Sequence, residues 1–202
     1  DRYAADRRAA SEALTPVERQ VEADAPVPTD DRIVVEGQGR RIVVDAAFGH
    51  EINETLGRLL SALVGQRTGS SVGMEVDPYR IELEVPPKVR PATVIAVLEE
   101  TDPAHVEALL ELALKNSDSL KFTLAQVAAK FGALKRYQGK GRFGGDRLLA
   151  ALEDTPVYDE AVREVFHTDL AVEETVDLLR RLHDGDVELV VAREPTPIGT
   201  GG

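Results

Sequence analysis

The sequence predicts an α+β fold in which a small antiparallel sheet with a crossover helix precedes a largely helical C-terminal half. Two observations lead to this fold class. Between residues 33 and 85, two β-branched runs and a later stretch of alternating apolar and polar residues indicate strands, and one segment between them has helical spacing. After residue 87 the apolar residues recur at intervals of three and four almost throughout, which is the spacing of one helix face.

The first half begins with a predicted β-hairpin. Two β-branched runs, 33–35 and 42–44, flank a Gly-rich turn at 37–39. From Gly49 to about Gly69 the leucines recur every three or four residues, so we expect an amphipathic helix whose apolar face lies on the hairpin.

Alternation then returns, and the helical half follows it. Val72, Met74 and Val76 predict one strand, and residues 81–85 predict the next. Several of the later helical stretches begin with an early proline or with an Asp, Ser or Thr cap. We expect helices within residues 91–102, 103–117, 119–134, 145–154, 155–169 and 171–185, and a last strand at 186–193 that rejoins the sheet.

These elements suggest how the chain is divided. Prolines at 26 and 28 end a helix-prone leader, and the Pro- and Gly-rich residues after 192 resemble a linker. We therefore expect a leading helix and linker from an upstream domain at 1–26, one domain at 27–192 and a flexible stub at 193–202. Within that domain, 27–86 is sheet-rich, 87–185 is helical and 186–192 is the final strand.

Composition narrows the possible functions. The chain has 202 residues, a net charge of −12 and no cysteine, which excludes disulfides and thiolate metal sites. No apolar run is long enough to cross a membrane and no signal peptide is recognisable, so we expect a cytoplasmic protein with no membrane partner. The four histidines are scattered without zinc-ligand spacing, and no phosphate-binding loop is present. We expect no catalytic residue, metal or cofactor in this chain.

One segment departs from the acidic background. Residues 130–147 hold six cations and one anion, with three aromatic and several glycine residues among them. Cations can follow the phosphates of a single strand while aromatic faces stack on its bases. The sequence thus predicts a nucleic-acid-binding site made of Lys130, Lys135, Arg136, Tyr137, Lys140, Arg142, Phe143 and Arg147.

Two structural alternatives stay open at this point. In the first, Phe131 and Leu134 finish the preceding helix on the core, and the basic segment is an ordinary loop whose cations balance nearby carboxylates. The second concerns His50 and Asn53, which begin a helix after Gly49. They could face an anion at the helix N-terminus, but the sequence favours a capping and packing role.

Several stretches, taken in order, resemble a known family. They are VPTDDRIVVEG, FGHEINETLGRLLSAL, DPYRIELEVP, KFTLAQVAAKFGALKR, TPVYDEAVREVF and LAVEETVDLLRRLHDGDVEL, and they extend from about Val27 to Val191. This series is similar to the DEAD/H-associated domain of archaeal large helicase-related (Lhr-type) proteins, which are ATP-dependent superfamily 2 helicases.

The resemblance implies an accessory domain that follows two RecA-like motor domains and a winged-helix domain. Such a domain would contact single-stranded DNA or a DNA/RNA hybrid and brace the motor during 3′ to 5′ translocation and unwinding, in DNA repair. ATP and Mg²⁺ would belong to the missing motor domains. Family members stack a tryptophan on a base, and this chain has no tryptophan.

Two other functions compete with this one. An acidic protein-interaction scaffold would dock the motor domains or a repair partner without touching nucleic acid, and it would expose a large apolar patch. A stand-alone hydrolase would need carboxylates or histidines clustered in a cleft, which the sequence does not display.

Overall fold

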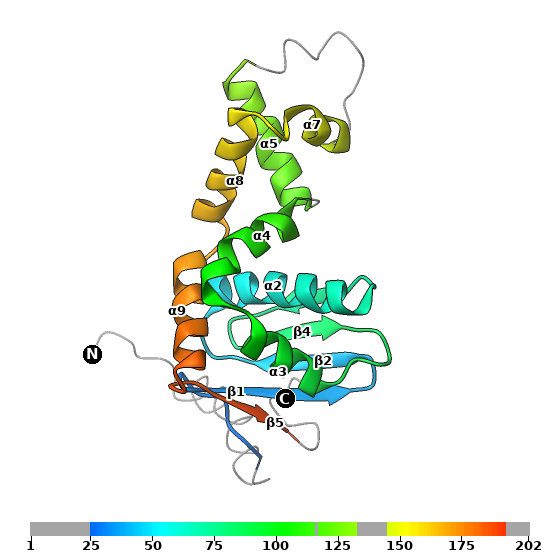
Figure 1. Cartoon of the computed structure of the whole chain (residues 1–202), viewed down its shortest axis with the longest axis vertical. Helices are drawn as coiled ribbons and strands as arrows, with labels where there is room; N and C mark the ends of the chain where they lie inside the picture. Colours follow the sequence, from blue (N-terminus) through cyan, green and yellow to red (C-terminus); the bar gives the residue numbers. More distant parts are fainter. Residues whose placement is uncertain (1–24, 116, 133–144, 193–202) are drawn as a thin grey trace, which may run out of the picture.

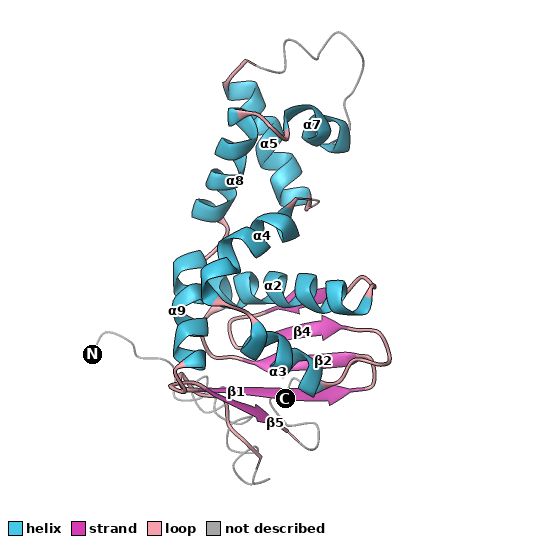
Figure 2. Ribbon diagram, viewed as in Figure 1, coloured by secondary structure: helices cyan, strands magenta, loops and turns pink. Residues whose placement is uncertain are grey.

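The computed structural model describes residues 25–115, 117–132 and 145–192, and these residues form two stacked lobes (Figure 1). The lower lobe is a sheet with helices on one face, and the upper lobe is made of helices alone (Figure 2). The α+β fold class is therefore confirmed, with helices dominating the C-terminal half. Residues 1–24 of the predicted leader at 1–26, and the stub at 193–202, lie outside the described residues.

The first four strands form the antiparallel sheet that the sequence predicts. Strands β1 (Arg32–Gln38) and β2 (Arg41–Asp45) pair as a hairpin, and β3 (Gly73–Val76) pairs with β4 (Arg80–Glu84). Strand β4 also pairs antiparallel with β2, which joins the two hairpins. The hairpin turn at Gly39 has a φ of 64°, a left-handed conformation that glycine adopts without steric cost.

The fifth strand makes the sheet mixed rather than wholly antiparallel. Strand β5 (Glu188–Val191) pairs parallel with β1, so the strand order is β3-β4-β2-β1-β5. The preceding helix α9 (Val172–His183) brings the chain back from the helical lobe along the sheet before β5 begins (Figure 1). A parallel neighbour needs such a crossover, because a tight turn joins only antiparallel strands.

The crossover helix α2 (His50–Thr68) lies across the sheet as predicted (Figure 1). Leu56, Leu59 and Leu60 on its inner face are buried. Gly57 allows a close approach, because a Cβ there would lie 3.1 Å from the nearest methyl carbons of Val76 and Ile81. The helix ends at Gly69, whose left-handed φ of 67° and bond to the Gly65 carbonyl close the last turn.

The remaining helices occur where the periodicity predicts them. Buried side chains on each of the longer ones recur at three- and four-residue spacing, as on Val106, Leu110 and Leu114. They are α3 (Pro91–Glu100), the short 3-10 helix η1 (Pro103–His105), α4 (Val106–Leu114), α5 (Asp118–Lys130), α7 (Gly145–Leu152) and α8 (Pro156–Thr168).

Each lobe has its own hydrophobic core, and a few residues join them. The core of the sheet lobe lies between the sheet and helices α2, α3 and α9, and the helical core lies among α5, α7 and α8. Phe166 and Val172 pack against both cores. The Thr55 hydroxyl of α2 accepts a 2.9 Å hydrogen bond from the Ala171 N–H, where α8 gives way to α9.

Candidate nucleic-acid interface

Helices α5 and α7 flank the predicted basic segment, and their packing positions its two ends. Leu120 and Leu124 of α5 are fully buried, and Leu148 and Leu152 of α7 are nearly so. Burial of one leucine side chain contributes about 1.5–3 kcal/mol, so this small core holds the two helices together. The residues that leave α5 and enter α7 are thereby held at the far end of the helical lobe (Figure 1).

The structure describes two of the eight predicted site residues. Lys130 is the last residue of α5, and Arg147 lies in the first turn of α7; both are exposed. The other six lie outside the described residues, and their role in binding stays a prediction. They are Lys135, Arg136, Tyr137, Lys140, Arg142 and Phe143.

Lys130 and Arg147 at the ends of the segment, and Lys121 earlier on α5, differ in their pairing. Lys130 Nζ lies 3.2 Å from Glu164 Oε1 of α8. Lys121 Nζ lies 2.7 Å from Asp146 Oδ1 of α7, and this hydrogen bond raises the pKa of Lys121. Arg147 makes no ion pair with a carboxylate of the described residues. Of these three cations, Arg147 is therefore the one whose charge is left for another anion.

The structural alternative for Phe131 is wrong. The Phe131 side chain is 64% exposed, so it does not finish α5 on the core. Gly132 follows with a φ of 67° and bonds to the Ala129 carbonyl, which turns the chain away from the helix axis directly after Phe131. An exposed aromatic ring beside Lys130 fits the stacking half of the predicted interface.

A second exposed aromatic ring on α5 was not singled out from the sequence. Phe122 is 67% exposed although it lies between the buried Leu120 and Leu124. Two residues along a helix correspond to a rotation of about 200°, so a residue two positions from both buried leucines faces outward. That spacing is the sequence signal that could have identified Phe122.

The structure confirms the packing role of Asn53. The residue is fully buried, and its Nδ2 donates to the Ala46 carbonyl at 2.8 Å and to the Asp77 carbonyl at 3.1 Å. The side chain therefore ties the end of β2 to the turn between β3 and β4 and does not face outward. Gly49 starts the helix with a φ of 89°, and His50 is exposed.

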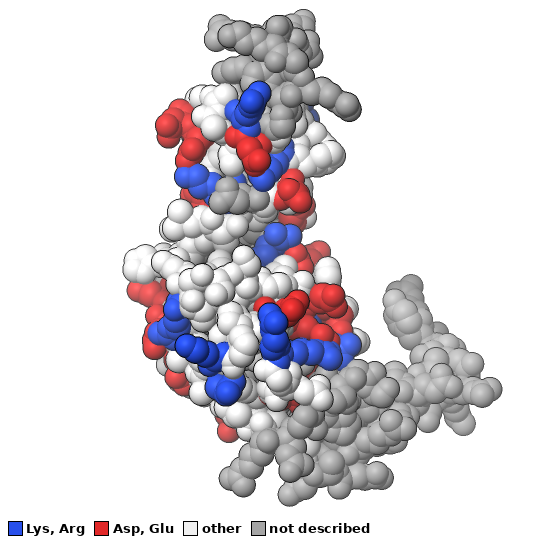
Figure 3. All heavy atoms as spheres, turned by 90° about the vertical axis from the view of Figure 1, so that its right-hand side faces the viewer, with Lys and Arg blue, Asp and Glu red and all other residues white. Residues whose placement is uncertain are grey.

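The visible surface carries both signs of charge. In Figure 3, Lys and Arg side chains are interspersed with Asp and Glu over both lobes. Most described cations lie near a carboxylate, as Arg163 lies 2.5 Å from Glu160 and Arg180 lies 2.8 Å from Asp177. Such a surface does not attract a polyanion over its whole extent, so any contact with nucleic acid must be local.

Within the part of the chain that the structure describes, no three His, Asp or Glu side chains come together in a way that could hold a metal ion. In the same residues, no helix is both long enough and apolar enough to span a bilayer.

Comparisons with known proteins address the class to which this fold belongs. The family model described as DEAD/H associated matches residues 27–199. The chain is 26% identical over 210 residues to the ATP-dependent helicase Lhr-Core of Methanothermobacter thermautotrophicus, and this match covers 95% of the chain and 24% of the helicase. The structure of Mycobacterium smegmatis helicase Lhr bound to ssDNA and AMP-PNP has a similar fold, with a TM-score of 0.71 at 20% identity over 95% of this chain and 27% of that one.

The chain belongs to the DEAD/H-associated family, because the family model covers most of its length. It spans about a quarter of the length of the two helicases that it resembles.

Proposed function

We propose that this chain is the accessory DEAD/H-associated part of an Lhr-type ATP-dependent helicase. In this proposal it contacts single-stranded DNA or a DNA/RNA hybrid at the far end of the helical lobe and braces the motor. The observation that carries the proposal is the DEAD/H-associated match over residues 27–199. The sequence lacks a phosphate-binding loop, so ATP and Mg²⁺ would be bound by motor domains elsewhere in the protein.

The local geometry supports a strand contact at this place. Phe131 is exposed beside Lys130, and Arg147 is exposed on the other side of the basic segment without a described carboxylate partner. Cations and aromatic faces in alternation are what a single-stranded nucleic acid needs, since phosphates and bases alternate along it. Movement from 3′ to 5′ and a role in DNA repair belong to the same proposal and follow from the family resemblance.

The test is binding of the chain to fluorescent single-stranded DNA over a series of salt concentrations. The test variant changes Lys135, Arg136, Lys140 and Arg142 to Gln. For single strands, log K falls against log salt with a slope of about −0.7 for each phosphate that is neutralised. We expect the variant to lose about 0.7 of this slope for every contact removed.

A matched control removes the same number of exposed cations elsewhere. The residues to change to Gln are Arg40, Lys88, Arg163 and Arg180. If the control loses as much slope as the test variant, the binding is a nonspecific effect of net charge. Unchanged affinity and slope in the test variant refute the strand contact at the basic segment.

The protein-interaction scaffold is kept as a second function because of specific exposed side chains. Leu112 of α4 and Phe122 of α5 are each 67% exposed. Large apolar side chains at such exposure are suited to contact with another domain. This function predicts that the chain does not bind single-stranded DNA even at low salt, so the same titration separates the two.

A further inference from the structure

The described residues cover the two faces of the sheet differently. Helices α2, α3 and α9 pack on the face that carries Ile33, Ile42 and Val44 (Figure 2). Because side chains alternate along a strand, Val34 and Val43 point to the opposite face, which we call the outer face. Within the part of the chain that the structure describes, no helix lies on the outer face.

The outer face is nevertheless buried where β1 and β2 pair. Val34 and Asp45 are fully buried, and Val43 and Glu36 are nearly so. Val34 lies opposite Asp45 and Val43 opposite Glu36 in the ladder, so the four side chains form one patch. Neighbouring strands shield such side chains from the sides but not from above, since each side chain stands out from the pleated sheet. A further layer must therefore lie over this patch.

The layer comes from outside the described residues. Val34 and Val43 belong to neither of the two cores that the described residues form, although Val35 and Val44 belong to the core of the sheet lobe. The patch is buried within a single chain, so the layer is a part of this chain. It excludes water from Asp45 without giving either carboxylate oxygen a hydrogen-bond partner, as an apolar layer does.

Three stretches of the chain are candidates, and two of them fit poorly. The stretch 133–144 leaves α5 and enters α7 at the far end of the helical lobe (Figure 1). The stretch 193–202 is short, and its prolines and glycines disfavour a helix or strand. Its one large apolar side chain is Ile198.

The third stretch, residues 1–24, has the sequence pattern of a helix with one apolar edge. Thr15 and Glu18 have the spacing of a capping box, with Pro16 at the first helical position between them. Val17 and Val21 are four residues apart and would share one side of that helix. A helix of ten residues is about 15 Å long, which is enough to cross neighbouring strands about 5 Å apart.

This stretch also ends close to the outer face. Residues 25–29, which follow it directly, are half-buried against the rest of the protein. Arg181 Nη2 of α9 donates to the Asp30 carbonyl at 2.8 Å, which fixes the chain just before β1 begins. Residues 1–24 are therefore joined by a short packed segment to the strand that carries Val34 and Glu36.

We propose that residues 1–24 dock on the outer face, with Val17 and Val21 against Val34 and Val43, and complete a layer on each side of the sheet. This assignment makes the leader a part of this domain, whereas the sequence analysis expects it to come from an upstream domain. It does not depend on the proposed strand contact, which uses the other lobe.

The test measures the reaction of a single cysteine with N-ethylmaleimide in the 202-residue chain, which has no cysteine of its own. Val43→Cys reports on the outer face, and Val44→Cys reports on the core under the helices. Both should react slowly in the otherwise unchanged chain. Adding Val17→Asp should speed the reaction of Val43→Cys at least about tenfold and leave Val44→Cys slow, since only the outer layer opens.

Ala23→Asp is the matched control. It adds the same charge two positions after Val21, a rotation of about 200° that places it away from the apolar edge. This control should leave Val43→Cys slow. Val17→Ala repeats the comparison without a new charge, and it should speed Val43→Cys by a smaller factor.

Four results overturn the proposal. The first is an unchanged rate of Val43→Cys in both Val17 variants, and the second is an equal effect of Ala23→Asp. The third is an equal rise at Val44→Cys in the milder Val17→Ala chain, because release of one layer exposes one face first. The fourth is faster reaction of Val43→Cys on Ile198→Asp or on dilution, because the cover would then be the C-terminal stretch or a second copy.

Discussion

Asp45 should make the stability of this protein fall as the pH rises through the neutral range. The residue ends β2 and points away from the helices, because its neighbour Val44 points into the core of the sheet lobe. Its side chain is fully buried, and neither carboxylate oxygen has a hydrogen-bond partner. A carboxylate in such a place is expensive to ionise.

Burial is the main cause that raises the pKa of Asp45 from 3.8 to about 7, and the negative charge of Glu36 is the next. Arg80, which faces Asp45 across the β2–β4 ladder, acts in the opposite direction but does not outweigh them. The carboxylates of Asp77 and Glu82 raise the pKa further.

The sign of the effect follows from proton binding. Between pH 4 and pH 7 the unfolded chain has released the Asp45 proton while the folded chain still holds it, so the free energy of unfolding falls as the pH rises. The change is complete above the folded pKa. With about 1.36 kcal/mol for each pKa unit, a rise from 3.8 to about 7 corresponds to a loss of about 4 kcal/mol.

The perturbation is Asp45→Asn, which keeps the shape of the side chain and replaces its ionisable carboxyl group with a neutral amide. We expect the variant to match the wild type near pH 4 and to be more stable by up to about 4 kcal/mol at pH 8. Urea denaturation followed by circular dichroism at pH 4.5, 6 and 8 measures this difference. Comparing the two proteins at each pH cancels the contribution of the carboxylates that do not interact with Asp45.

Asp186→Asn serves as the control, because Asp186 is exposed and its removal should change stability little at any pH. The reasoning is refuted if the difference between Asp45→Asn and the wild type stays constant with pH. It is also refuted if the variant becomes relatively less stable as the pH rises, since Asp45 would then be stabilising as a carboxylate.

Two other substitutions test how α2 is fixed on the sheet. Asn53→Ala leaves the carbonyls of Ala46 and Asp77 without their buried donor. We expect it to lower the free energy of unfolding, measured in urea, by about 1–3 kcal/mol. The control Gln126→Ala, on the exposed side of α5, should change stability little. Gly57→Val places methyl groups where even a Cβ would lie 3.1 Å from neighbouring side chains, so we expect a loss of about 1–3 kcal/mol. The control is Ala129→Val at an exposed position of α5, which should lower the free energy of unfolding only through helix propensity, by up to about 0.7 kcal/mol. Equal losses of stability in the two valine variants would refute the close approach at Gly57.

The elements of the sheet lobe could be predicted because local patterns determine them. The hairpin turn requires a glycine at position 39, and the helix that follows ends at a left-handed glycine. The run Ile42, Val43 and Val44 predicts a strand, but all three side chains are buried and only Ile42 and Val44 belong to the core of the sheet lobe, so the sequence did not show which face packs on the helices. The parallel pairing of β5 with β1 had no such signal, because it joins residues about 155 positions apart and depends on where α9 returns the chain.

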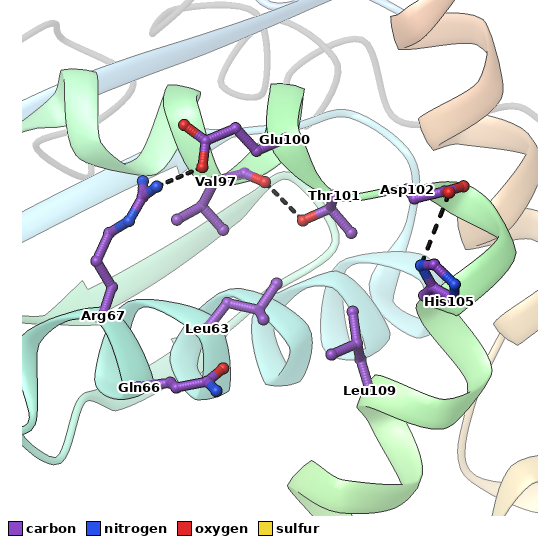
Figure 4. Close-up of a pocket in the computed structure, with 9 residues that line it drawn as sticks. All are labelled: Leu63, Gln66, Arg67, Val97, Glu100, Thr101, Asp102, His105 and Leu109. Atoms are coloured by element: carbon purple, nitrogen blue, oxygen red, sulfur yellow. Dashed lines mark hydrogen bonds and ion pairs between the residues drawn. The ribbon is translucent and has the colours of Figure 1, made fainter.

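The candidate site was harder to predict from the sequence for a similar reason. A cluster of cations is visible in the sequence, but the carboxylates that neutralise some of them come from other helices. Glu164 of α8 lies beside Lys130, whereas Asp146, the one anion within the cluster, pairs with Lys121 of α5 outside it. The groove lined by Leu63, Val97 and Leu109 (Figure 4) was also missed, since a groove is formed by tertiary packing and leaves no local pattern.

The junction of the lobes determines how a contact on the helical lobe reaches the sheet lobe. Phe166 and Val172 pack against both cores, and the buried bond from the Ala171 N–H to the Thr55 hydroxyl links the start of α9 to α2. The same Thr55 hydroxyl donates to the Glu51 carbonyl at 2.8 Å, so it is satisfied on both sides and fixed in orientation. A strand held at the far end of the helical lobe would therefore be connected to the sheet lobe through packed elements. This arrangement gives the proposed bracing role a physical basis, since a force on the bound strand would reach the sheet lobe through this junction.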